Sequence, residues 1–239
     1  GYAISNDGIF WNRPYNNPVL TPGNYYAWDA TAAIAGAIIH EADGYKMYYV
    51  GWSDQNENWH IGLATSPDGV SWTKLPSPVI YGTTGWEYQV IPSSIHKVDG
   101  VYYLYYYGRN FPNYKIGLAL SNDGINWTKY NGNPILVPNV LWEGTGVFHP
   151  SVIIEDQLFK MVYMNSNGTA FGMATSVDGK NWTKNSSNPF FKRNSTSNNW
   201  ANGSIAYPCF IKVGNEYRIY YSGYPVNNSV YKIGFTKKL

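Results

Sequence analysis

The stretch IGLALSNDGINWTKYNGNPIL, which spans residues 116–136, contains the pattern that decides the fold. A short apolar run at residues 116–119 leads to Asp123-Gly124, and Trp127 follows the glycine by three residues. Asp-Gly between two apolar segments is a strong β-hairpin signal, because glycine accepts a positive φ and the aspartate bonds backbone N–H groups of the turn. The stretch therefore predicts two strands joined by a tight turn, with the tryptophan packed on that hairpin.

The same pattern occurs four times, and a second pattern alternates with it. The turns are centred on Asp7, Asp68, Asp123 and Asp178, at intervals of 55–61 residues. Between them, a tryptophan that is usually followed by an acid precedes an apolar strand and then a strongly aromatic strand, such as residues 101–107. Each unit of about 55 residues thus supplies four strands, which corresponds to one blade of a β-propeller. A role in the turn accounts for the four aspartates, and none of them is predicted to be catalytic.

The composition agrees with an all-β protein and excludes several classes. Of 239 residues, 18% are aromatic and 13% are charged, and aromatic residues favour strands. The net charge of +2 has no basic cluster, which argues against a nucleic-acid partner, and no apolar run reaches the ~18 residues of a membrane helix. The single cysteine, Cys209, lies in an apolar strand pattern and is expected to be buried. We expect a protein that is secreted or located at the cell surface or in the periplasm.

The units predict a single β-propeller domain over residues 1–239, but their count is uneven. The chain begins in the middle of a unit, so the inner two strands of one blade have no counterpart. Four blades would leave one N-terminal strand surplus. Five blades, four of them full four-stranded repeats, would leave one blade without its inner half, as if an upstream half-blade were lacking. We expect five blades, and we expect association through the open strand edges.

Together, the motifs resemble a known superfamily. The tryptophan-acid pairs, Pro-Ser-Val-Ile at 150–153, Tyr-Lys-Met-Tyr-Tyr at 45–49 and Asn-Pro-Ile-Leu at 133–136 are similar to the five-bladed propellers of arabinanases, levansucrases and invertases. These include glycoside hydrolase families 43, 32, 62 and 68. The resemblance implies three carboxylates from different blades at the mouth of a central funnel. They would serve as nucleophile or base, as a stabilising group and as general acid.

One departure from the superfamily concerns the catalytic aspartate. There it often directly precedes the proline of the innermost strand. At this position the sequence has Ala35, Ile91, His149 and Tyr207, none of which is a carboxylate. The family's catalytic aspartate therefore cannot be transferred simply to this chain.

Propeller topology places the tryptophan-acid loops and the loops after the aromatic strands on one face. We predict Asp29, Glu87 and Glu143 as catalytic residues, because glycosidic cleavage needs two carboxyl groups. The predicted substrate-binding residues are aromatic, amide or charged: Trp28, Trp52, Asp54, Trp86, Gln89, Arg109, Trp142, His149, Trp200 and Asn202. No metal ligands are predicted and no cofactor is required. The sequence leaves open whether a structural calcium or sodium ion lies in the central channel.

The repetition of the acids in successive units favours an alternative to catalysis, namely a structural role. Asp29, Glu87 and Glu143 occupy nearly equivalent positions, so each could bond its own loop, whereas Arg109, His149 and Gln89 have no counterparts in the other units and are better functional clues. Three functions follow. The first is a glycoside hydrolase that acts on a polysaccharide or oligosaccharide, with Asp29 as base or nucleophile and Glu87 or Glu143 as acid. The others are a non-catalytic, lectin-like glycan-binding propeller and, less favoured, a protein-interaction platform.

Overall fold

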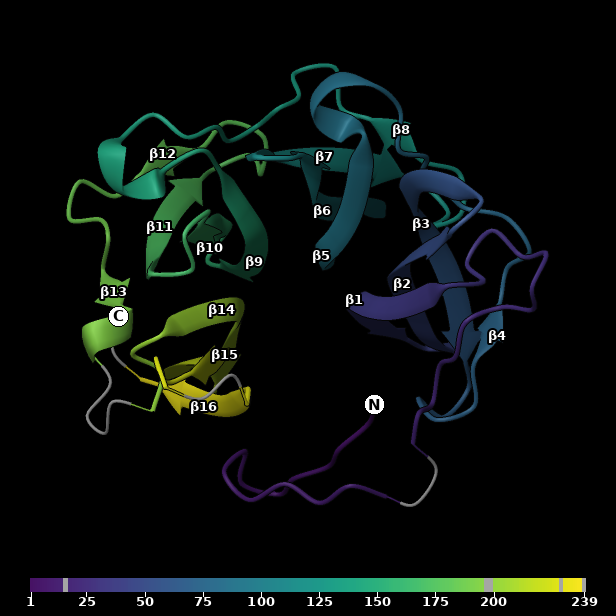
Figure 1. Cartoon of the computed structure of the whole chain (residues 1–239), viewed down its shortest axis with the longest axis horizontal. Helices are drawn as coiled ribbons and strands as arrows, with labels where there is room; N and C mark the ends of the chain where they lie inside the picture. The colour runs from purple at the N-terminus through teal and green to yellow at the C-terminus, as the bar shows by residue number, and fades with distance from the viewer. Residues whose placement is uncertain (15–16, 196–199, 228–229, 238–239) are drawn as a thin grey trace.

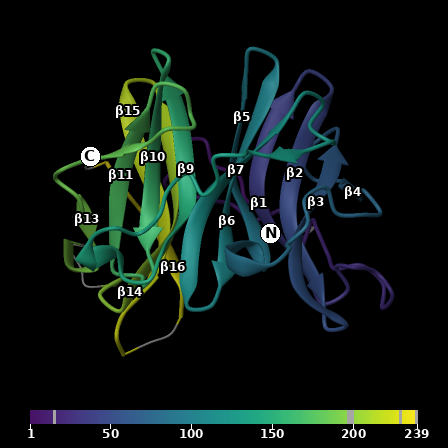
Figure 2. The ribbon, with the colours of Figure 1, turned by 90° about the horizontal axis from the view of Figure 1, so that it is seen from above.

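The computed structural model describes residues 1–14, 17–195, 200–227 and 230–237. Its strands form four antiparallel sheets arranged around a central axis, as Figure 1 shows. From the side, the strands run along this axis (Figure 2). The prediction of an all-β propeller is confirmed. No helix in the described part of the chain is long and apolar enough to cross a membrane.

The four sheets are blades 1 to 4 in chain order, and each begins with its innermost strand. Blade 1 contains β1 (Ala32–Glu41), β2 (Gly44–Ser53), β3 (Asn56–Ser66) and β4 (Thr73–Lys74). Blade 2 contains β5 (Gln89–Val98), β6 (Val101–Asn110), β7 (Asn113–Ser121) and β8 (Thr128–Lys129). Blade 3 contains β9 (Val147–Glu155), β10 (Leu158–Asn165), β11 (Ala170–Ser176), β12 (Thr183–Lys184) and β13 (Phe191–Lys192). Blade 4 contains β14 (Ser204–Val213), β15 (Glu216–Tyr224) and β16 (Lys232–Thr236). Single 3-10 turns at Gly85–Glu87, Leu141–Glu143 and Arg193–Ser195 lie between blades.

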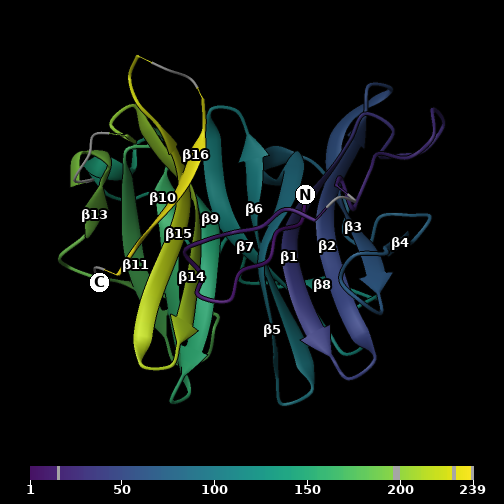
Figure 3. The same cartoon turned by 90° about the horizontal axis from the view of Figure 1, so that it is seen from below.

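The expectation of five blades is wrong for this chain, which forms four. Residues 1–14 carry an Asp-Gly hairpin but form no sheet, and a single bridge joins Ile4 to Asn12. This N-terminal segment lies across the gap between blade 4 and blade 1, as Figures 1 and 3 show. The described residues before β1 supply no aromatic second strand, so the hairpin has no inner partner with which to build a sheet. The ring is therefore open on one side.

The second strand of each blade lies at the centre of its sheet and is buried from both sides. In β2, the neighbouring residues Tyr48 and Tyr49 are both fully buried, although successive side chains of a strand point to opposite faces. Tyr105 and Tyr106 repeat this arrangement in β6. Each sheet therefore carries apolar side chains on both faces, and a neighbour on either side must cover them.

Each Asp-Gly hairpin is stabilised from within. Asp123 accepts hydrogen bonds from the backbone N–H groups of Ile125 and Asn126, both 2.8 Å long, and these bonds hold the pKa of its carboxyl below the usual range. Gly124 follows with a φ of 75°, which an L-residue rarely adopts. Tyr48 of blade 1 donates its hydroxyl to the carbonyl of Gly124 over 2.7 Å. We call this last contact, from one blade to the hairpin of the next, the tyrosine clasp.

The tyrosine clasp recurs around the ring. Tyr105 of blade 2 donates to Gly179 over 3.0 Å, and Tyr220 of blade 4 donates to Gly8 of the N-terminal segment over 2.8 Å. Val162 holds this position in blade 3, and the described residues after β16 contain no Asp-Gly hairpin that it could meet. The N-terminal hairpin is thus docked on blade 4 as the hairpin of a following unit would be.

Carboxylates strengthen two of the interfaces between blades. Glu41, at the end of β1, accepts hydrogen bonds from Lys97 (2.8 Å) and Tyr102 (2.6 Å) of blade 2. Burial alone would raise the pKa of Glu41, but the hydrogen bonds from its lysine and tyrosine neighbours lower it to about 2. Glu155 of blade 3 bonds Lys212 and Tyr217 of blade 4 in the same way. The carboxylate of one blade is therefore held by a lysine and a tyrosine of the next.

The tyrosine clasp predicts a measurable loss of stability when one hydroxyl is removed. Tyr105→Phe leaves the buried carbonyl of Gly179 without its donor, so the free energy of unfolding should fall by about 1–2 kcal/mol. Urea unfolding measures this loss, and Tyr26→Phe, at a tyrosine that is 88% exposed, is the control that should change nothing. Equal stability of the Tyr105→Phe variant and the wild type would show that the clasp is only a consequence of packing.

Candidate functional site

The innermost strands of all four blades surround a cavity of about 540 Å³ on the axis. Its wall includes residues 34–36 of β1, 91–93 of β5, 148–151 of β9 and 207–209 of β14. The pairing between the first two strands shifts register at this level in every blade. Such bulges re-aim side chains, and they are common next to binding sites. The cavity is therefore built by an irregularity that all four blades share.

Arg109 brings the positive charge of the cavity. It lies near the end of β6 in register with Gln89, and its guanidinium carbon is 5.2 Å from the ring centre of Trp59. The Nε of Arg109 is buried, as is the hydroxyl of Ser93, and neither has a hydrogen-bond partner among the described residues. A buried polar atom without a partner costs about 1–3 kcal/mol, so the fold carries an unfavourable polar arrangement beside the cavity.

His149 lies at the bulge of β9 with a φ of 49°, and Tyr207 occupies the equivalent position of β14 with a φ of 56°. Non-glycine residues in this region are strained, and such strain concentrates at functional sites. The imidazole packs between the rings of Tyr107 and Tyr207, each 4.5 Å away between ring centres. Burial lowers the pKa of His149 to about 3, so the ring is neutral at neutral pH. It can offer one donor and one acceptor to an uncharged partner.

Two stacked aromatic pairs border the same cavity. Trp52 and Trp59 lie parallel with ring centres 4.2 Å apart, and Tyr114 lies 4.6 Å from Phe148. Trp59, Tyr114 and Phe148 line the cavity, while Trp52 supports Trp59 from behind. Flat aromatic surfaces next to a few aimed polar groups are typical of a small-molecule site.

Glu143 has a different environment from the one predicted for a catalytic acid. Its fully buried carboxylate accepts hydrogen bonds from Tyr163 (2.9 Å) and the backbone N–H of Asn139 (2.8 Å), and Lys184 lies 2.6 Å away. Burial lowers the pKa of Lys184, and Glu143 opposes that shift. The carboxylate therefore joins its loop to the second and fourth strands of its own blade.

Asp29 and Glu87 make the same contacts in their blades. Each acid accepts a hydrogen bond from a tyrosine of the second strand and forms an ion pair with a lysine of the short fourth strand. For Asp29 these partners are Tyr49 and Lys74, whose Nζ lies 2.6 Å from the carboxylate. For Glu87 they are Tyr106 and Lys129, whose Nζ lies 3.1 Å from the carboxylate. None of the three acids belongs to the wall of the axial cavity. The structure thus supports the structural alternative for each of them, while their catalytic role stays a prediction.

Blade 4 provides an internal check on this interpretation. Ala201 replaces the acid there and is fully buried. The described part of blade 4 also shows no short fourth strand, and no described lysine holds the position of Lys74, Lys129 and Lys184 there. Among the described residues, an acid is therefore present in the three blades that show the lysine, and alanine is present in the blade that does not.

The four tryptophans that precede these positions also belong to the blades. Each stacks on a tyrosine of the second strand at 5.4–6.1 Å between ring centres: Trp28 on Tyr49, Trp86 on Tyr106, Trp142 on Tyr163 and Trp200 on Tyr221. Glycines make room for them, since a Cβ on Gly172 would lie 2.8 Å from Trp142. We therefore assign these tryptophans to packing rather than to the wall of the cavity.

Two further predicted residues stand apart from the cavity. Asp54 is exposed in the turn after β2, and its backbone N–H donates to Thr31. Asn202 accepts a hydrogen bond from the backbone N–H of Val226 and so connects two loops of blade 4. Of the predicted site residues, the structure brings Arg109 and His149 into the cavity wall. Gln89 pairs with Arg109 in the sheet, and Trp52 stacks on Trp59 of the wall.

Sequence reasoning missed the aromatic wall of the cavity. Trp59, Tyr114 and Phe148 belong to no repeated motif, and Tyr107 lies in a repeated aromatic strand, so nothing distinguished them from packing residues. Tyr207 had a usable signal, because it precedes a proline of the innermost strand just as His149 does.

Cys209 corrects one further expectation. It is exposed rather than buried, although its equivalents Ala37, Ser94 and Ser151 are buried. The following blade contacts Ser94 and Ser151, whereas the described residues form no sheet after blade 4. No three His, Cys, Asp or Glu side chains of the described chain come together as a metal site.

Comparisons with known proteins agree with this architecture. The family model for the glycosyl hydrolases family 32 N-terminal domain matches residues 35–201. A β-1,2-mannobiose phosphorylase of Thermoanaerobacter sp. (strain X514) is 28% identical over 131 residues, which are 48% of this chain and 43% of that protein. The chain thus matches less than half the length of this relative.

Solved structures show the same fold at low sequence identity. A glycoside hydrolase superposes with a TM-score of 0.78 at 17% identity and covers 99% of this chain and 78% of its own. A second structure belongs to work on the GH130 family of mannoside phosphorylases, which contains glycoside hydrolases that target β-1,2 mannosidic linkages in Candida mannan. It gives a TM-score of 0.73 at 18% identity, and the match covers 93% of this chain and 74% of that one.

The buried carboxylate of Glu143 predicts that its substitution lowers the stability of the fold and leaves the axial cavity intact. Glu143→Gln leaves Lys184 buried without its counter-charge, so the free energy of unfolding should fall by about 3 kcal/mol. The same substitution at Glu216, whose pair with Lys237 is solvent-exposed, should change little. Urea unfolding compares the two variants. Equal losses in both would mean that Glu143 has no special structural role.

His149 predicts a dependence of stability on pH. Its folded pKa of about 3 lies below the ordinary value of 6.5, so between these values the unfolded chain binds a proton that the folded chain does not. Stability should fall as pH decreases from 6.5, by up to about 1.4 kcal/mol per pH unit. His149→Asn tolerates the positive φ and removes this contribution. The free energies of unfolding of both proteins, measured at pH 6.5, 5.5 and 4.5, should converge towards low pH. A difference that stays constant over this range would exclude the lowered pKa.

Proposed function

This chain belongs to the family of the glycosyl hydrolases family 32 N-terminal domain, and on that basis we propose that it is a carbohydrate-active propeller whose axial cavity binds the glycan. The observation that carries the proposal is the combination of Arg109 and His149 with the aromatic wall of the cavity. The proposal concerns a carbohydrate-active propeller, and the identity of the sugar is part of the test.

The wall of the cavity suits a sugar ring. Trp59 and Tyr114 line the cavity with aromatic rings, and aromatic rings contact the C–H groups of a pyranose or furanose favourably. Arg109 donates to ring hydroxyls through a fixed planar fork, and neutral His149 donates or accepts one hydrogen bond.

Cleavage by water through paired carboxylates needs two of them, about 5 Å apart for retention or roughly 6.5–9.5 Å apart for inversion. No carboxylate is among the described residues that line the cavity. In the hydrolase proposal, Asp29, Glu87 or Glu143 would have to exchange its lysine for the substrate. Their contacts speak against this step, and they favour the non-catalytic glycan-binding alternative for the described part of the chain.

A second candidate for the cleavage step is phosphorolysis. Arg109 lies in the cavity wall, where no carboxylate competes for its guanidinium, and arginine is well suited to bind a phosphate oxyanion with two parallel hydrogen bonds. The mannobiose phosphorylase from Thermoanaerobacter sp. matches about half of this chain, which favours β-1,2-linked mannosides as the first substrates to test.

The decisive experiment is a glycan screen that includes β-1,2-mannosides, with and without inorganic phosphate, and that measures both binding and released sugar. The wild type should bind a glycan, Arg109→Gln should bind it at least 10-fold more weakly with unchanged stability, and Glu143→Gln should bind as the wild type does. Release that depends on phosphate identifies a phosphorylase, and release in water alone identifies a hydrolase. Binding without any release identifies a lectin-like propeller.

The converse pattern would refute the assignment of the site. If Glu143→Gln abolishes release while it still binds the glycan, and Arg109→Gln behaves as the wild type does, the site lies at the tryptophan-acid loops. The axial cavity would then not be the place of reaction.

A further inference from the structure

A hollow of about 330 Å³ lies between blades 2 and 3 and shares no residue with the wall of the axial cavity. It is lined by the loop at residues 130–135, which follows the last strand of blade 2, and by residues 180–183 of the Asp-Gly hairpin of blade 3. This hairpin lies at the end of the blade opposite to the tryptophan-acid loop, because β11 runs away from that loop. We call this hollow the rim pocket.

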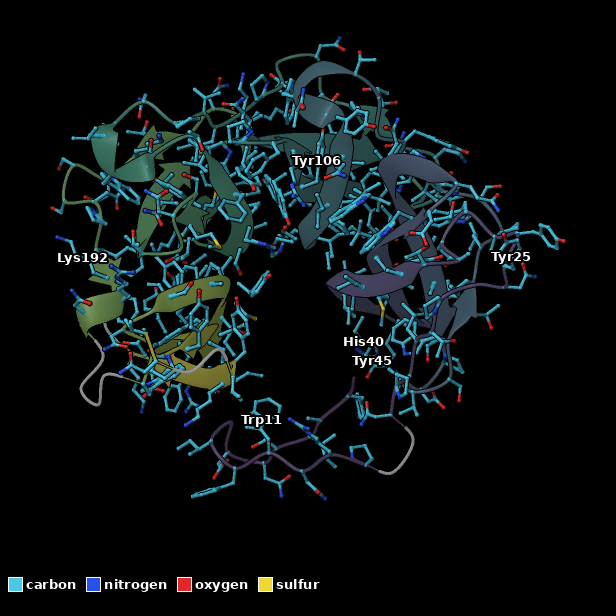
Figure 4. The ribbon with its side chains drawn as sticks, in the orientation of Figure 1. Trp11, Tyr25, His40, Tyr45, Tyr106 and Lys192 are labelled. Atoms are coloured by element: carbon cyan, nitrogen blue, oxygen red, sulfur yellow. The ribbon has the colours of Figure 1, made fainter. Side chains whose placement is uncertain are left out.

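Two aromatic side chains of the rim pocket are held in place by their own loops. Gly132 leaves room for the ring of Tyr130, since a Cβ on this glycine would lie 2.5 Å from the ring. The Nδ2 of Asn133 fastens the same loop to the hydroxyl of Tyr106, which Figure 4 shows on blade 2, over 3.0 Å. Trp182 donates its ring N–H to the backbone of its own hairpin over 3.2 Å. The aromatic part of the pocket is therefore preformed.

Lys180 is the cation of the rim pocket, and it departs from the repeat. The other three hairpins have an apolar residue at this position: Ile9, Val70 and Ile125. The Nζ of partly buried Lys180 lies 5.8 Å from the ring centre of Tyr130 and 6.0 Å from that of Tyr103. No carboxylate of the described residues lies within ion-pair distance of this ammonium group. Lys180 is thus available to an anion.

The interface between blades 2 and 3 also lacks the carboxylate of the other two interfaces. The strand pairings place Val98 of blade 2 at the position of Glu41 and Glu155. Tyr103 takes the place of the lysines that pair with these glutamates, which are Lys46 and Lys160. At this interface a cation therefore lies beside tyrosine rings, and the described residues supply no acid for it.

The equivalent hollow between blades 1 and 2 has a volume of about 440 Å³ and provides an internal comparison. Both hollows are lined by the tryptophan, the asparagine and the threonine of the hairpin motif: Trp127, Asn126 and Thr128 in one, and Trp182, Asn181 and Thr183 in the other. Leu75 takes the place of Tyr130, since both donate the same backbone hydrogen bond to the third strand, and Ile125 takes the place of Lys180. The tyrosine and the lysine therefore occur together and distinguish the rim pocket from its apolar equivalent.

These groups fit a sugar that carries a carboxylate. The ammonium of Lys180 pairs with a carboxylate, and the rings of Tyr130 and Trp182 contact the C–H groups of a sugar. The Nδ2 of Asn181 is bound to Asp178 over 2.7 Å, while its Oδ1 has no partner among the described residues and can accept a hydrogen bond from a hydroxyl. Asp178 itself is engaged by the backbone N–H groups of its turn.

We propose that the rim pocket is a second carbohydrate site, and that it binds a carboxylated sugar residue such as a hexuronic acid. The carboxylate pairs with Lys180, the sugar ring packs against Tyr130 and Trp182, and Asn181 accepts a hydroxyl. Such a site holds the protein on an acidic polysaccharide while the axial cavity stays free. The proposal does not depend on which sugar the axial cavity binds or on any cleavage there.

The test measures the binding of methyl glucuronide and methyl galacturonide to the full chain by ligand-observed NMR, with methyl glucoside and methyl galactoside as neutral counterparts. The uronides should bind at least about 10-fold more tightly, because only they offer a carboxylate to Lys180. A rise from about 50 to about 500 mM salt should weaken uronide binding alone. Sodium acetate at the concentration of the uronide should not displace it, because acetate lacks the ring.

Three variants locate the site. Lys180→Met should weaken uronide binding at least about 10-fold with unchanged stability, because the other hairpins have an apolar residue at this position. Lys192→Met, at an exposed lysine that Figure 4 shows on the outer side of blade 3, should bind uronides as the wild type does. Arg109→Gln should also keep uronide binding, which separates this proposal from that of the axial cavity.

Three results would overturn the proposal. The first is equal binding of uronides and neutral sugars, or no uronide binding. The second is uronide binding that Lys180→Met leaves intact or that Arg109→Gln abolishes, because the acidic sugar then binds elsewhere. The third is displacement of the uronide by an equal concentration of acetate, because the pocket then recognises a simple anion rather than a sugar.

Discussion

Every sheet in this molecule is apolar on both faces, and this constraint governs the rest of the structure. A strand such as β2 buries Tyr48 on one side and Tyr49 on the other, so a neighbour is needed on each side. The ring arrangement provides these neighbours with one kind of interface. The tyrosine clasps and the clusters around Glu41 and Glu155 then set the register of one blade against the next. Where the described residues supply no neighbour, as beside Ile38 of β1 and Ile233 of β16, apolar side chains of these sheets are exposed.

The tryptophan-acid loops illustrate how a repeated polar motif can belong to the fold. A buried ion pair such as that between Glu143 and Lys184 adds little net stability compared with apolar packing, but it is directional, because a misplaced partner leaves a charge without compensation. Each pair connects the loop that enters a blade with the short strand that ends it. Ala201 holds the position of the acid in the blade for which the described residues show no fourth strand. The axial cavity, in contrast, is built from residues that differ from blade to blade.

The sequence was sufficient to predict the repeat, the strands and the propeller, because the Asp-Gly hairpins and aromatic strands are local patterns that recur. It predicted the structural role of Asp123 for the same reason. The number of blades was not predictable, since a strand such as residues 2–4 is identical whether or not a partner lies beside it. The exposure of Cys209 escaped prediction because burial depends on a neighbouring sheet. Lys184, the partner of Glu143, lies 41 residues away, so only the fold reveals the pair. Arg109 and His149 were identified because they depart from the repeat.

The open ring has a mechanical consequence. In a closed ring the rotations between neighbouring sheets must sum to a full turn, so an error at one interface is compensated at the others. The described residues join four sheets in an arc, and small rotations at successive interfaces of this arc therefore add up between its first and last sheets. The distance between Ala35 on the first sheet and Tyr207 on the last is the dimension that such rotations change most. The axial cavity has one wall whose width depends on the angular tolerance of the whole arc, including contacts as remote as those of Glu41 and Glu155.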